Sequence, residues 1–500
     1  DLVAFANKHY KENYAVVYKR TGKDLNTQKV EKPQITKVPL NREDRSELHV
    51  KLANQETAKL QPKFLDYKTD LEFFNIGPLE VIYKENTDND LFELTYHFNY
   101  GKNQDPKIEL AASLMNYVGA GNLSPEDLKT EFYKLGAGYN FSTSTDGEET
   151  QITLSGLSEN MEASIKLFES LLENPVGTQD ALDKLVGRIL KSRTDAKKNK
   201  NLILSRQLYS YGKYGEVNPA SNVLTSEELM EVSVAELMDR IKELTKKQHR
   251  ILFYGNQDEK TLTNLVKTYH KIPESLKEVS DVETYSEKNY DKEYVFWTHF
   301  DMVQTEIILL SKQELLDNAK TAAIRLFNQY FGGGMNSIVF QEIREAQGLA
   351  YSVFSTYRQA NKPDRSDYLF SYIGIQSDKQ KEALSSMFNL INNLPESPQA
   401  FEIGKQAILN KIESERITKA GVLYNYLSAE KRGNDYDIRE KVYDEVKAMD
   451  LEKLIEFHKT YIKDKPHTIL LIGNRDNIDL KNLEQYGTVK ELSLETLFGF

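Results

Sequence analysis

The chain has 500 residues, and its 65 Lys and Arg residues against 76 Asp and Glu residues leave a net charge of −11. It has no cysteine, which excludes disulfides, thiolate metal sites, iron–sulfur clusters and a cysteine nucleophile. The acidic balance argues against a dedicated nucleic-acid-binding protein, and no apolar run approaches the ~20 residues that cross a bilayer. Length alone favours about three domains.

The chain opens at Asp1 with neither an initiator Met nor a signal peptide. Residues 5–10 are typical of a helix end, and the apolar residues 14–18 predict a strand. A lone helix and strand cannot bury an apolar face, so we expect residue 1 to lie inside a larger polypeptide, or this strand to complete a domain of another chain. A stray N-terminal element is the alternative. Residues 21–61, charged and with two prolines, predict an extended linker.

The first large segment begins with an alternating strand. Phe92, Leu94, Tyr96 and Phe98 alternate with polar residues, which predicts one buried face and one solvated face carrying His97.

Turn and cap residues divide the rest of this segment. Ser124 followed by Pro125 is typical of a helix start, and Asp146-Gly147 is typical of a hairpin turn. These signals predict a helix ending at Gly136, strands over 139–145 and 149–157, and helices near 160–173 and 179–199.

The second large segment alternates strands and helices in the same way. It predicts strands near 294–310, helices near 314–331 and 335–346, strands near 350–358 and 367–376, and two more helices. Because hairpins mix with helices, we expect an α+β fold, in which each domain is a mainly antiparallel sheet covered by helices on one face. A doubly wound parallel sheet is less favoured, since successive strands are joined too briefly.

The two segments are copies of each other. Residues 249–256 (HRILFYGN) recur as residues 467–474 (HTILLIGN), an offset of 467 − 249 = 218, and each run follows an amphipathic helix. The chain therefore contains two tandem homologous domains.

The common catalytic and metal-binding motifs are absent from the sequence. None of the eight histidines lies three or four residues from another, so no helix presents two imidazoles on one face. His249 and His467 precede apolar strands and are expected to be cap or loop residues rather than ligands. The glycines at 332–334 are not followed by the Lys-Ser or Lys-Thr of a phosphate-binding loop, and there is no G-x-S-x-G nucleophile elbow.

The most informative stretch is residues 331–353 (FGGGMNSIVFQEIREAQGLAYSV). It predicts a capped short helix with Ile338 or Val339 and Ile343 inward, a stop at Gly348, and then a strand. Arg344 and Tyr351 are seven residues apart, and the turn at Gly348 could fold them toward one another. The simple alternative is a solvated Arg and a packed Tyr.

This stretch resembles the second sequence signature of the pitrilysin and insulin-degrading-enzyme family of zinc metallopeptidases, the inverzincins, which includes relatives of mitochondrial processing peptidase. Their pattern is Gly-Gly-Gly-Met-x-Ser, then Phe-x-x-x-Arg-x-x-x-Gly-Leu-Ala-Tyr-Ser-Val. The resemblance implies tandem α+β domains that pair as two halves of a clamshell. It divides the chain into 1–24, the terminal helix and strand of a preceding domain; 25–66, an extended linker; 67–283, an inactive third domain; and 284–500, a fourth domain with the Arg/Tyr signature.

The resemblance also implies roles for four residues. Arg344 and Tyr351 would reach across a closed chamber, bind the substrate backbone near the scissile carbonyl and help to hold the oxyanion. Gly333 and Gly334 would bind substrate. A planar guanidinium and a phenol are suitable donors for a carbonyl oxygen that gains negative charge.

The family's zinc motif, H-x-x-E-H, is degenerate in this chain. Its positions hold Ala112, Met115 and Asn116, and the helix from which the third ligand would come reads LKSR at 190–193. The resemblance thus implies that zinc is bound by another half and that this chain has no metal site.

The function implied is that of the C-terminal half of a zinc-dependent metalloendopeptidase that encloses and cleaves unfolded peptides, inactive by itself. Its partner would be an N-terminal zinc-bearing half, in the same polypeptide or in a partner chain. The alternative is a non-catalytic peptide-binding subunit that pairs with a separate zinc-bearing chain; a purely structural subunit is disfavoured by the presence of both Arg344 and Tyr351. A bacterial periplasm or cell envelope is slightly favoured over the cytoplasm.

Overall fold

The computed structural model of the chain describes residues 1–22, 26, 46–55, 60–279, 285–290 and 292–500. Contacts divide the chain into two compact units, Asp1–Lys59 and Leu60–Phe500. In the described part, no helix is long and apolar enough to span a bilayer.

The first unit contains two helices and no strand among its described residues. Helix α1 (Leu2–His9) begins at Asp1, whose carboxylate accepts a hydrogen bond from the Ala4 backbone N–H, and α2 spans Glu47–Ala53. Residues 14–18 form no strand in this structure and their side chains are exposed, so their assignment as a strand of a preceding domain stays a prediction. The linker predicted to be extended is helical over α2; its residues 23–25, 27–45 and 56–59 lie outside the described part.

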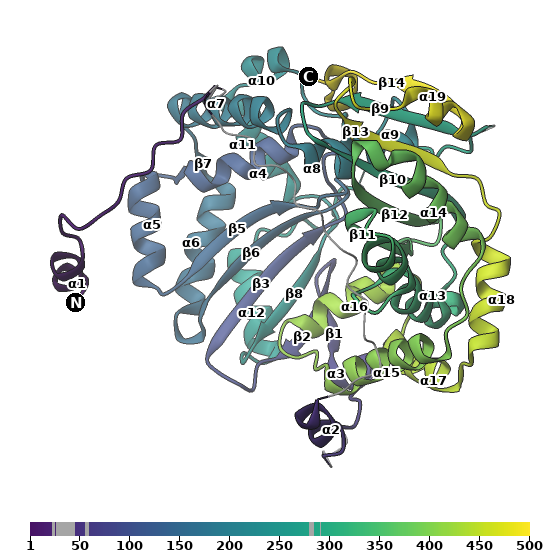
Figure 1. Cartoon of the computed structure of the whole chain (residues 1–500). Coiled ribbons are helices and arrows are strands. Elements are labelled where there is room, and N and C mark those ends of the chain that lie inside the picture. Colours follow the sequence, from purple (N-terminus) through teal and green to yellow (C-terminus); the bar gives the residue numbers. More distant parts are fainter. Residues whose placement is uncertain (23–25, 27–45, 56–59, 280–284, 291) are drawn as a thin grey trace. The chain divides into compact units, whose positions relative to one another are not determined.

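A six-stranded sheet forms the centre of the first repeat (Figure 1). All neighbouring strands are antiparallel except β2 and β8, which are parallel. In spatial order the strands are β1 (Glu72–Ile76), β2 (Leu79–Glu85), β8 (Arg250–Gly255), β3 (Leu91–Phe98), β6 (Thr150–Leu157) and β5 (Gly138–Thr143).

The second repeat has its own six-stranded sheet. Its first three pairings are antiparallel, and β9 pairs in parallel with both β13 and β14. The order is β11 (Ala350–Arg358), β12 (Ser366–Gln376), β10 (Gln304–Leu315), β13 (Thr468–Gly473), β9 (Tyr294–His299) and β14 (Thr488–Glu491).

The strand registers support the internal duplication. Leu94 of β3 pairs with Phe253 and Leu154, and Ile307 of β10 pairs with Leu471 and Ile373. The partners are offset by 471 − 253 = 218 and 373 − 154 = 219 residues. The two sheets differ at one edge, which β1 fills from before β2 in the first repeat and β14 fills from the chain's end in the second.

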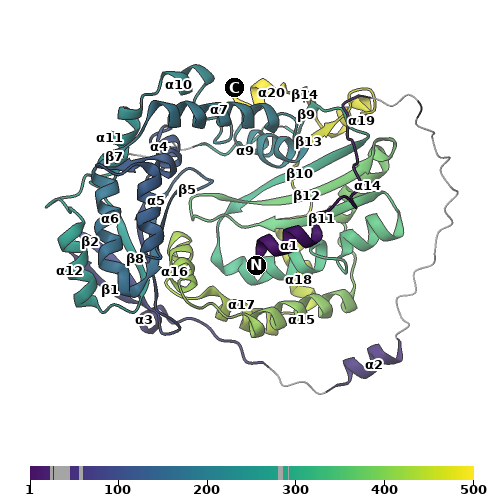
Figure 2. The ribbon, with the colours of Figure 1, turned by 90° about the vertical axis from the view of Figure 1, so that its left-hand side faces the viewer.

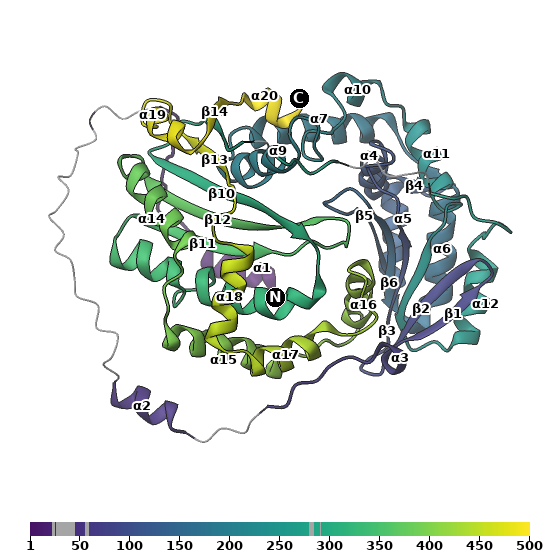
Figure 3. The ribbon, with the colours of Figure 1, turned by 90° about the vertical axis from the view of Figure 1, so that its right-hand side faces the viewer.

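Each sheet has one face covered by helices of its own repeat, while α16 (Gly421–Lys431) packs on the opposite face of the first sheet and α9 (Tyr209–Tyr214) on that of the second. Figures 2 and 3, from opposite sides, show α6 and α12 beside the first sheet and α14 and α18 beside the second. The first repeat also has a short ladder, β4 (Gly119–Ala120) with β7 (Pro175–Val176). Its helices are α3 (Tyr67–Asp70), α4 (Ile108–Leu114), α5 (Pro125–Lys134), α6 (Met161–Glu173), α7 (Gln179–Ala196), α8 (Lys200–Leu202), α9 (Tyr209–Tyr214), α10 (Ser226–Glu231), α11 (Val234–Leu244) and α12 (Glu259–Tyr269).

The helices of the second repeat follow the same plan, with additions at its C-terminal side. They are α13 (Thr321–Phe327), α14 (Gln380–Asn392), α15 (Pro398–Ser414), α16 (Gly421–Lys431), α17 (Ile438–Ala448), α18 (Leu451–Tyr461), α19 (Leu480–Leu483) and α20 (Leu494–Phe498). The predicted α+β fold with mainly antiparallel sheets is confirmed. The domain boundaries remain predictions.

Local signals located several elements correctly. The Ser124 hydroxyl accepts a hydrogen bond from the Asp127 backbone N–H and caps α5, and Gly136, with φ of 60°, follows the helix end. The Asp146-Gly147 turn joins β5 to β6 as predicted. One boundary was wrong: β10 continues to Leu315, so the helix expected from 314 begins at Thr321.

The face of β3 predicted to be solvated is instead covered by the second repeat. Helix α16 packs on β2, and the Tyr424 hydroxyl donates to Glu93 on β3 at 2.8 Å. His97 is only 6% exposed, and its Nε2 lies 3.4 Å from Glu149 Oε2. The prediction of a solvated His97 is therefore wrong, because the polar residues of this face meet another polar surface rather than water.

The loop between β5 and β6 joins the two repeats by ion pairs. Glu148, 4% exposed, lies 2.8 Å from Lys362 Nζ and 3.4 Å from Lys431 Nζ, and also pairs with Arg365. Lys431 contacts Glu149 at 2.7 Å as well. Three cations of the second repeat thus surround one nearly buried carboxylate of the first.

Candidate functional site

The signature segment lies between α13 and the edge strand β11 of the second sheet. Helix α13 continues into a π-helical turn, Asn328–Gly332, and a second π-helical turn spans Phe340–Ala346. Ile338, Val339 and Ile343 are buried in the second core, as predicted. Burial of these three side chains fixes the segment to the sheet.

The glycine run satisfies two different backbone requirements. A Cβ on Gly332 would lie 2.0 Å from the backbone oxygen of Ser355 on β11, so only glycine allows this approach. Gly334 has φ of 94°, a conformation that favours glycine, and its surroundings are open. Gly333 lines a cavity beside α13. The substrate-binding role of Gly333 and Gly334 stays a prediction.

The turn at Gly348 brings Arg344 and Tyr351 together. Gly348 has φ of 60°, and its N–H donates to the Arg344 carbonyl at 3.2 Å. The Leu349 N–H donates to the Ile343 carbonyl at 3.0 Å, which closes a helix C-terminal turn. The Arg344 guanidinium carbon lies 5.2 Å from the centroid of the Tyr351 ring. The two residues that the sequence singled out are therefore neighbours.

Tyr351 lies in an irregularity of an edge strand. The register of β11 against β12 shifts between Ala350 and Ser352, so Tyr351 occupies a β-bulge. Bulges redirect side chains, and Tyr351 is 76% exposed. The alternative of a packed Tyr is thus wrong, since this ring projects from the surface beside Arg344.

The Arg344–Tyr351 pair presents hydrogen-bond donors at an accessible edge. Arg344 Nε lies 3.6 Å from Glu345 Oε1, which is too long for a hydrogen bond. A guanidinium offers five N–H donors and a phenol offers one. Together these groups can bind a peptide carbonyl oxygen.

The degenerate motif lies in the core of the first repeat. Ala112, on α4, and Met115, in the 3₁₀ turn that follows, are buried, and Asn116 Nδ2 donates to the Ser113 carbonyl at 3.4 Å. Neither an imidazole nor a carboxylate stands at these three positions. Across the described residues, no group of three or more His, Asp or Glu side chains could hold a metal ion.

A cation stands on the helix from which the third zinc ligand would come. Arg193 of α7 lines a cavity of about 360 Å³ that Glu109 and Ser113 of α4 also line. It donates to the Leu224 carbonyl at 2.6 Å and stacks 4.5 Å from the centroid of Phe500. A guanidinium repels a metal cation, so the residues present do not fit zinc.

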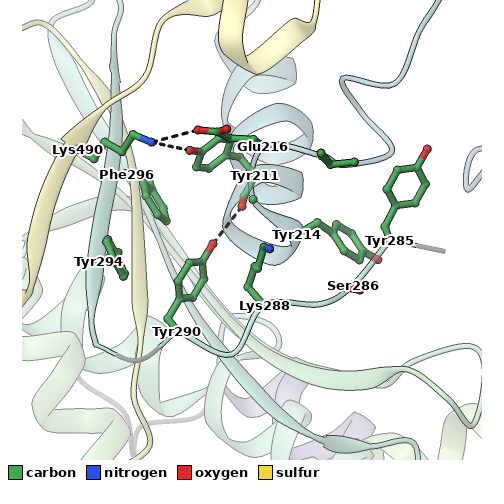
Figure 4. Close-up of a pocket in the computed structure, with 12 residues that line it drawn as sticks. Tyr211, Tyr214, Glu216, Tyr285, Ser286, Lys288, Tyr290, Tyr294, Phe296 and Lys490 are labelled. Atoms are coloured by element: carbon green, nitrogen blue, oxygen red, sulfur yellow. Dashed lines mark hydrogen bonds and ion pairs between the residues drawn. The ribbon is translucent and has the colours of Figure 1, made fainter. Parts of the chain in front are cut away.

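Another cavity, of about 570 Å³, lies where α9 meets β9 and β14 (Figure 4). Lys490 donates to the Tyr211 hydroxyl at 3.0 Å and lies 3.6 Å from Glu216, while the Tyr290 hydroxyl donates to the Tyr211 carbonyl at 3.3 Å. These tyrosines come from distant parts of the sequence and follow no motif, so sequence reasoning missed the cavity.

Comparison with known proteins relates part of the chain to a known family. The family described as "Peptidase M16 inactive domain" matches residues 232–407. Residues 232–407 are thus similar to an M16 inactive domain. This match confirms the resemblance predicted from residues 331–353. The matched domain is the inactive one, in agreement with the predicted non-zinc-binding half.

The sequence relatives of this chain carry contrasting names. The "Non-peptidase homolog YmxG" of Helicobacter pylori is 22% identical over 80% of this chain and 93% of its own length. An "Uncharacterized zinc protease" of Rickettsia bellii is 24% identical over 58% of this chain and 68% of its own.

Solved structures share the fold. An M16 inactive domain from Pseudomonas fluorescens, 17% identical, superposes with a TM-score of 0.63 over 81% of this chain and 98% of its own. The periplasmic protease PqqL of Escherichia coli, 13% identical, gives 0.63 over 95% of this chain and 50% of its own. The ferredoxin protease FusC, in complex with Arabidopsis ferredoxin, superposes with a TM-score of 0.65 over 90% of this chain and 49% of its own. This chain therefore spans about half of each of the two proteases.

Proposed function

We propose that this chain is the C-terminal, non-zinc half of a zinc-dependent metalloendopeptidase, in which Arg344 and Tyr351 bind the substrate carbonyl. The observation that carries the proposal is the pairing of the Arg344 guanidinium with the exposed Tyr351 ring at a bulged sheet edge. The Gly348 turn and buried Ile343 fix the backbone that carries the two side chains, which supports a pair that is placed before substrate binds.

Prior placement matters for catalysis. The carbonyl oxygen of a peptide gains negative charge as the bond is attacked, and donors that are already oriented stabilise that charge without reorganisation. Arg344 and Tyr351 would donate to this oxygen or to the adjacent backbone of an unfolded peptide enclosed between the halves of the clamshell. Zinc would be supplied by the partner half, because Ala112, Met115 and Asn116 provide no ligand set.

The partner would be an N-terminal zinc-bearing half, within the same polypeptide or as a separate chain. Two neighbours in fold, PqqL and FusC, are named proteases and are about twice the length that this chain covers, which supports a missing half. PqqL is named a periplasmic protease, which favours a periplasm or cell envelope for this chain.

A second function is favoured by the relative named a non-peptidase homologue, which this chain matches over 93% of that protein's length. In that case the chain would be a non-catalytic subunit that binds unfolded peptides and pairs with a separate zinc-bearing chain. The two functions share the Arg344–Tyr351 site and differ in whether bound peptide is cleaved.

The test is hydrolysis of an unfolded, fluorescence-quenched peptide by the chain alone and by its complex with a zinc-bearing half. We expect no hydrolysis and no stoichiometric zinc with the chain alone, and chelator-sensitive hydrolysis with the complex. Tyr351→Phe or Arg344→Ala should lower kcat about 100-fold, as loss of an oxyanion donor does.

Tyr133→Phe, on the exposed surface of α5, is the matched control and should leave the rate unchanged. Zinc-dependent hydrolysis by the isolated chain would contradict the proposal. Peptide binding without hydrolysis by the complex would select the subunit function.

A further inference from the structure

A cavity of about 560 Å³ lies in the second repeat among α13, α15, α16 and α17. Helices α13, α15 and α17 pack against one another, in the lower right part of Figure 1. The volume is that of a small-molecule site. Tyr67, before the first sheet, closes one wall through a hydrogen bond from its hydroxyl to Asn425 Oδ1 at 2.6 Å.

Two buried polar side chains that line this cavity lack hydrogen-bond partners within the described chain. They are Thr321, 3% exposed, through its Oγ1, and Asn434, 8% exposed, through its Nδ2. A buried polar atom without a partner destabilises the fold, so such atoms are usually satisfied by a ligand or an ordered water. Both of these groups can donate.

The charges of the cavity wall are unbalanced toward positive. Arg325 and Arg432 both line it, and within the described residues the Arg325 guanidinium makes no hydrogen bond or ion pair. Among the residues that the structure describes, the Arg432 guanidinium donates to neutral oxygens: the Ala360 carbonyl at 3.2 Å, Gln359 Oε1 at 3.1 Å and Asn318 Oδ1 at 3.4 Å.

The acids of the wall are already committed to a third arginine. Asp437 accepts from Arg439 Nη2 at 2.6 Å, and Glu415 lies 3.4 Å from Arg439 Nη1. Burial, and then the nearby charge of Arg432, lower the pKa of Arg325. Buried Asp367 attracts Arg432, and Glu415 and Asp437 attract Arg325, but among the described residues no carboxylate forms an ion pair with either guanidinium. Two partly desolvated guanidinium groups without a directly paired anion form an arrangement that a bound anion would stabilise.

We propose that this cavity is an oxyanion-binding site, in which Arg325 and Arg432 bind a phosphate or carboxylate group and Thr321 Oγ1 and Asn434 Nδ2 donate to it. Guanidinium groups bind both anions through paired N–H donors, and every unused polar group named here can donate. The two sources of such a group are a free phosphate-type anion and the terminal carboxylate of a peptide. Neither Arg344 nor Tyr351 lines the cavity, so the proposed anion site does not use the pair that carries the proposed peptidase function, although Gly333, which is predicted to bind substrate, lines one wall.

The experiment is isothermal titration calorimetry on the whole chain. One arm uses inorganic phosphate; the other compares tetra-alanine with a free C-terminal carboxylate against the same peptide as its amide. We expect binding of phosphate or of the acid peptide, but not of the amide. Arg325→Met should weaken that binding at least tenfold, because it removes the unpaired charge and keeps the side-chain length.

A second variant guards against misfolding of the first. Asn434→Asp places a carboxylate in the cavity, occupies the arginines and should also abolish binding. Arg475→Met removes a surface arginine that stacks near Trp297 and should leave binding intact. Failure of both anions to bind at millimolar concentration would overturn the proposal. Equal binding by the wild type, Arg325→Met and Asn434→Asp, or equal binding of the acid and amide peptides without phosphate binding, would also overturn it.

Discussion

At the scale of single residues, the duplication repeats a buried histidine. His249 precedes β8 and His467 precedes β13, and both are buried. His249 Nδ1 lies 2.7 Å from the Lys247 carbonyl oxygen, and the Lys465 carbonyl is the corresponding partner of His467. Burial lowers the pKa of His249 to about 3 and that of His467 to about 4. Both imidazoles are therefore neutral in the folded chain at neutral pH.

This pair predicts an acid-sensitive stability. In the unfolded chain both histidines take up a proton near pH 6.5, whereas in the folded chain they resist protonation until about pH 4 and pH 3. Their contribution to the free energy of unfolding is therefore fully present above pH 6.5. It is lost as the pH falls from 6.5 to about 4 for His467 and to about 3 for His249. Urea unfolding at pH 7, 6 and 5 should show a falling free energy of unfolding.

The control for this prediction is His467→Gln, which cannot titrate. Between pH 6 and 5, this variant should lower the slope of the free energy of unfolding against pH by the amount that corresponds to about one proton fewer taken up on unfolding. This holds whatever its effect on stability at pH 7. An unchanged slope would mean that this histidine is not buried in its neutral form.

At the scale of elements, the contact between the π-helical turn at Asn328–Gly332 and strand β11 depends on Gly332. Its Cβ position lies 2.0 Å from a backbone oxygen of β11, which cannot rotate away as a side chain can. Gly332→Ala should therefore lower the free energy of unfolding by about 2–3 kcal/mol, the cost of overpacking a core. Denaturant unfolding measures this.

Gly187→Ala in α7 is the matched control. Its Cβ would meet no atom within 4 Å, and alanine favours a helix over glycine, so this variant should be more stable by up to about 1 kcal/mol. A Gly332→Ala variant as stable as the wild type would show that β11 can shift to accept the methyl group.

Local elements were predictable where a short signal decides them. The Ser124 cap, the Asp146-Gly147 turn and the Gly348 stop each act within a few residues, and the structure has all three. The bulge at Tyr351 was not predictable, because it arises from the register of β11 against β12. Residues 14–18 have a strand's composition but form no strand in this structure, because a strand also needs a neighbouring strand to pair with.

At the scale of the molecule, packing between the repeats explains what the sequence could not reveal. His97 was predicted to be solvated because one repeat's pattern cannot show that α16 of the other repeat covers its sheet. The nearness of Arg344 and Tyr351 was predictable, since only one turn separates them. The oxyanion cavity was not, because Arg325 lies on α13, whereas Arg432 and Asn434 follow α16, far from it in the sequence.

The junction between the repeats yields the last prediction, at Glu148. Three cations surround this carboxylate, and their side chains are 23–31% exposed, so they regain some hydration when it is removed. Glu148→Gln should lower the free energy of unfolding by about 2 kcal/mol, less than the 3–5 kcal/mol expected for a fully buried pair. Glu131→Gln, which breaks an exposed pair with Lys134 on α5, should change it by under about 1 kcal/mol.

The salt dependence of stability tests whether the charges around Glu148 stabilise the junction between the repeats. Because the cluster is partly exposed, added salt should weaken it in the wild type and so narrow the gap between the wild type and Glu148→Gln. If the junction couples the repeats, Glu148→Gln should also broaden the unfolding transition, since one repeat can then unfold ahead of the other. If Glu148→Gln has the same unfolding midpoint and the same transition width as Glu131→Gln, then apolar contacts, and not these charges, hold the repeats together.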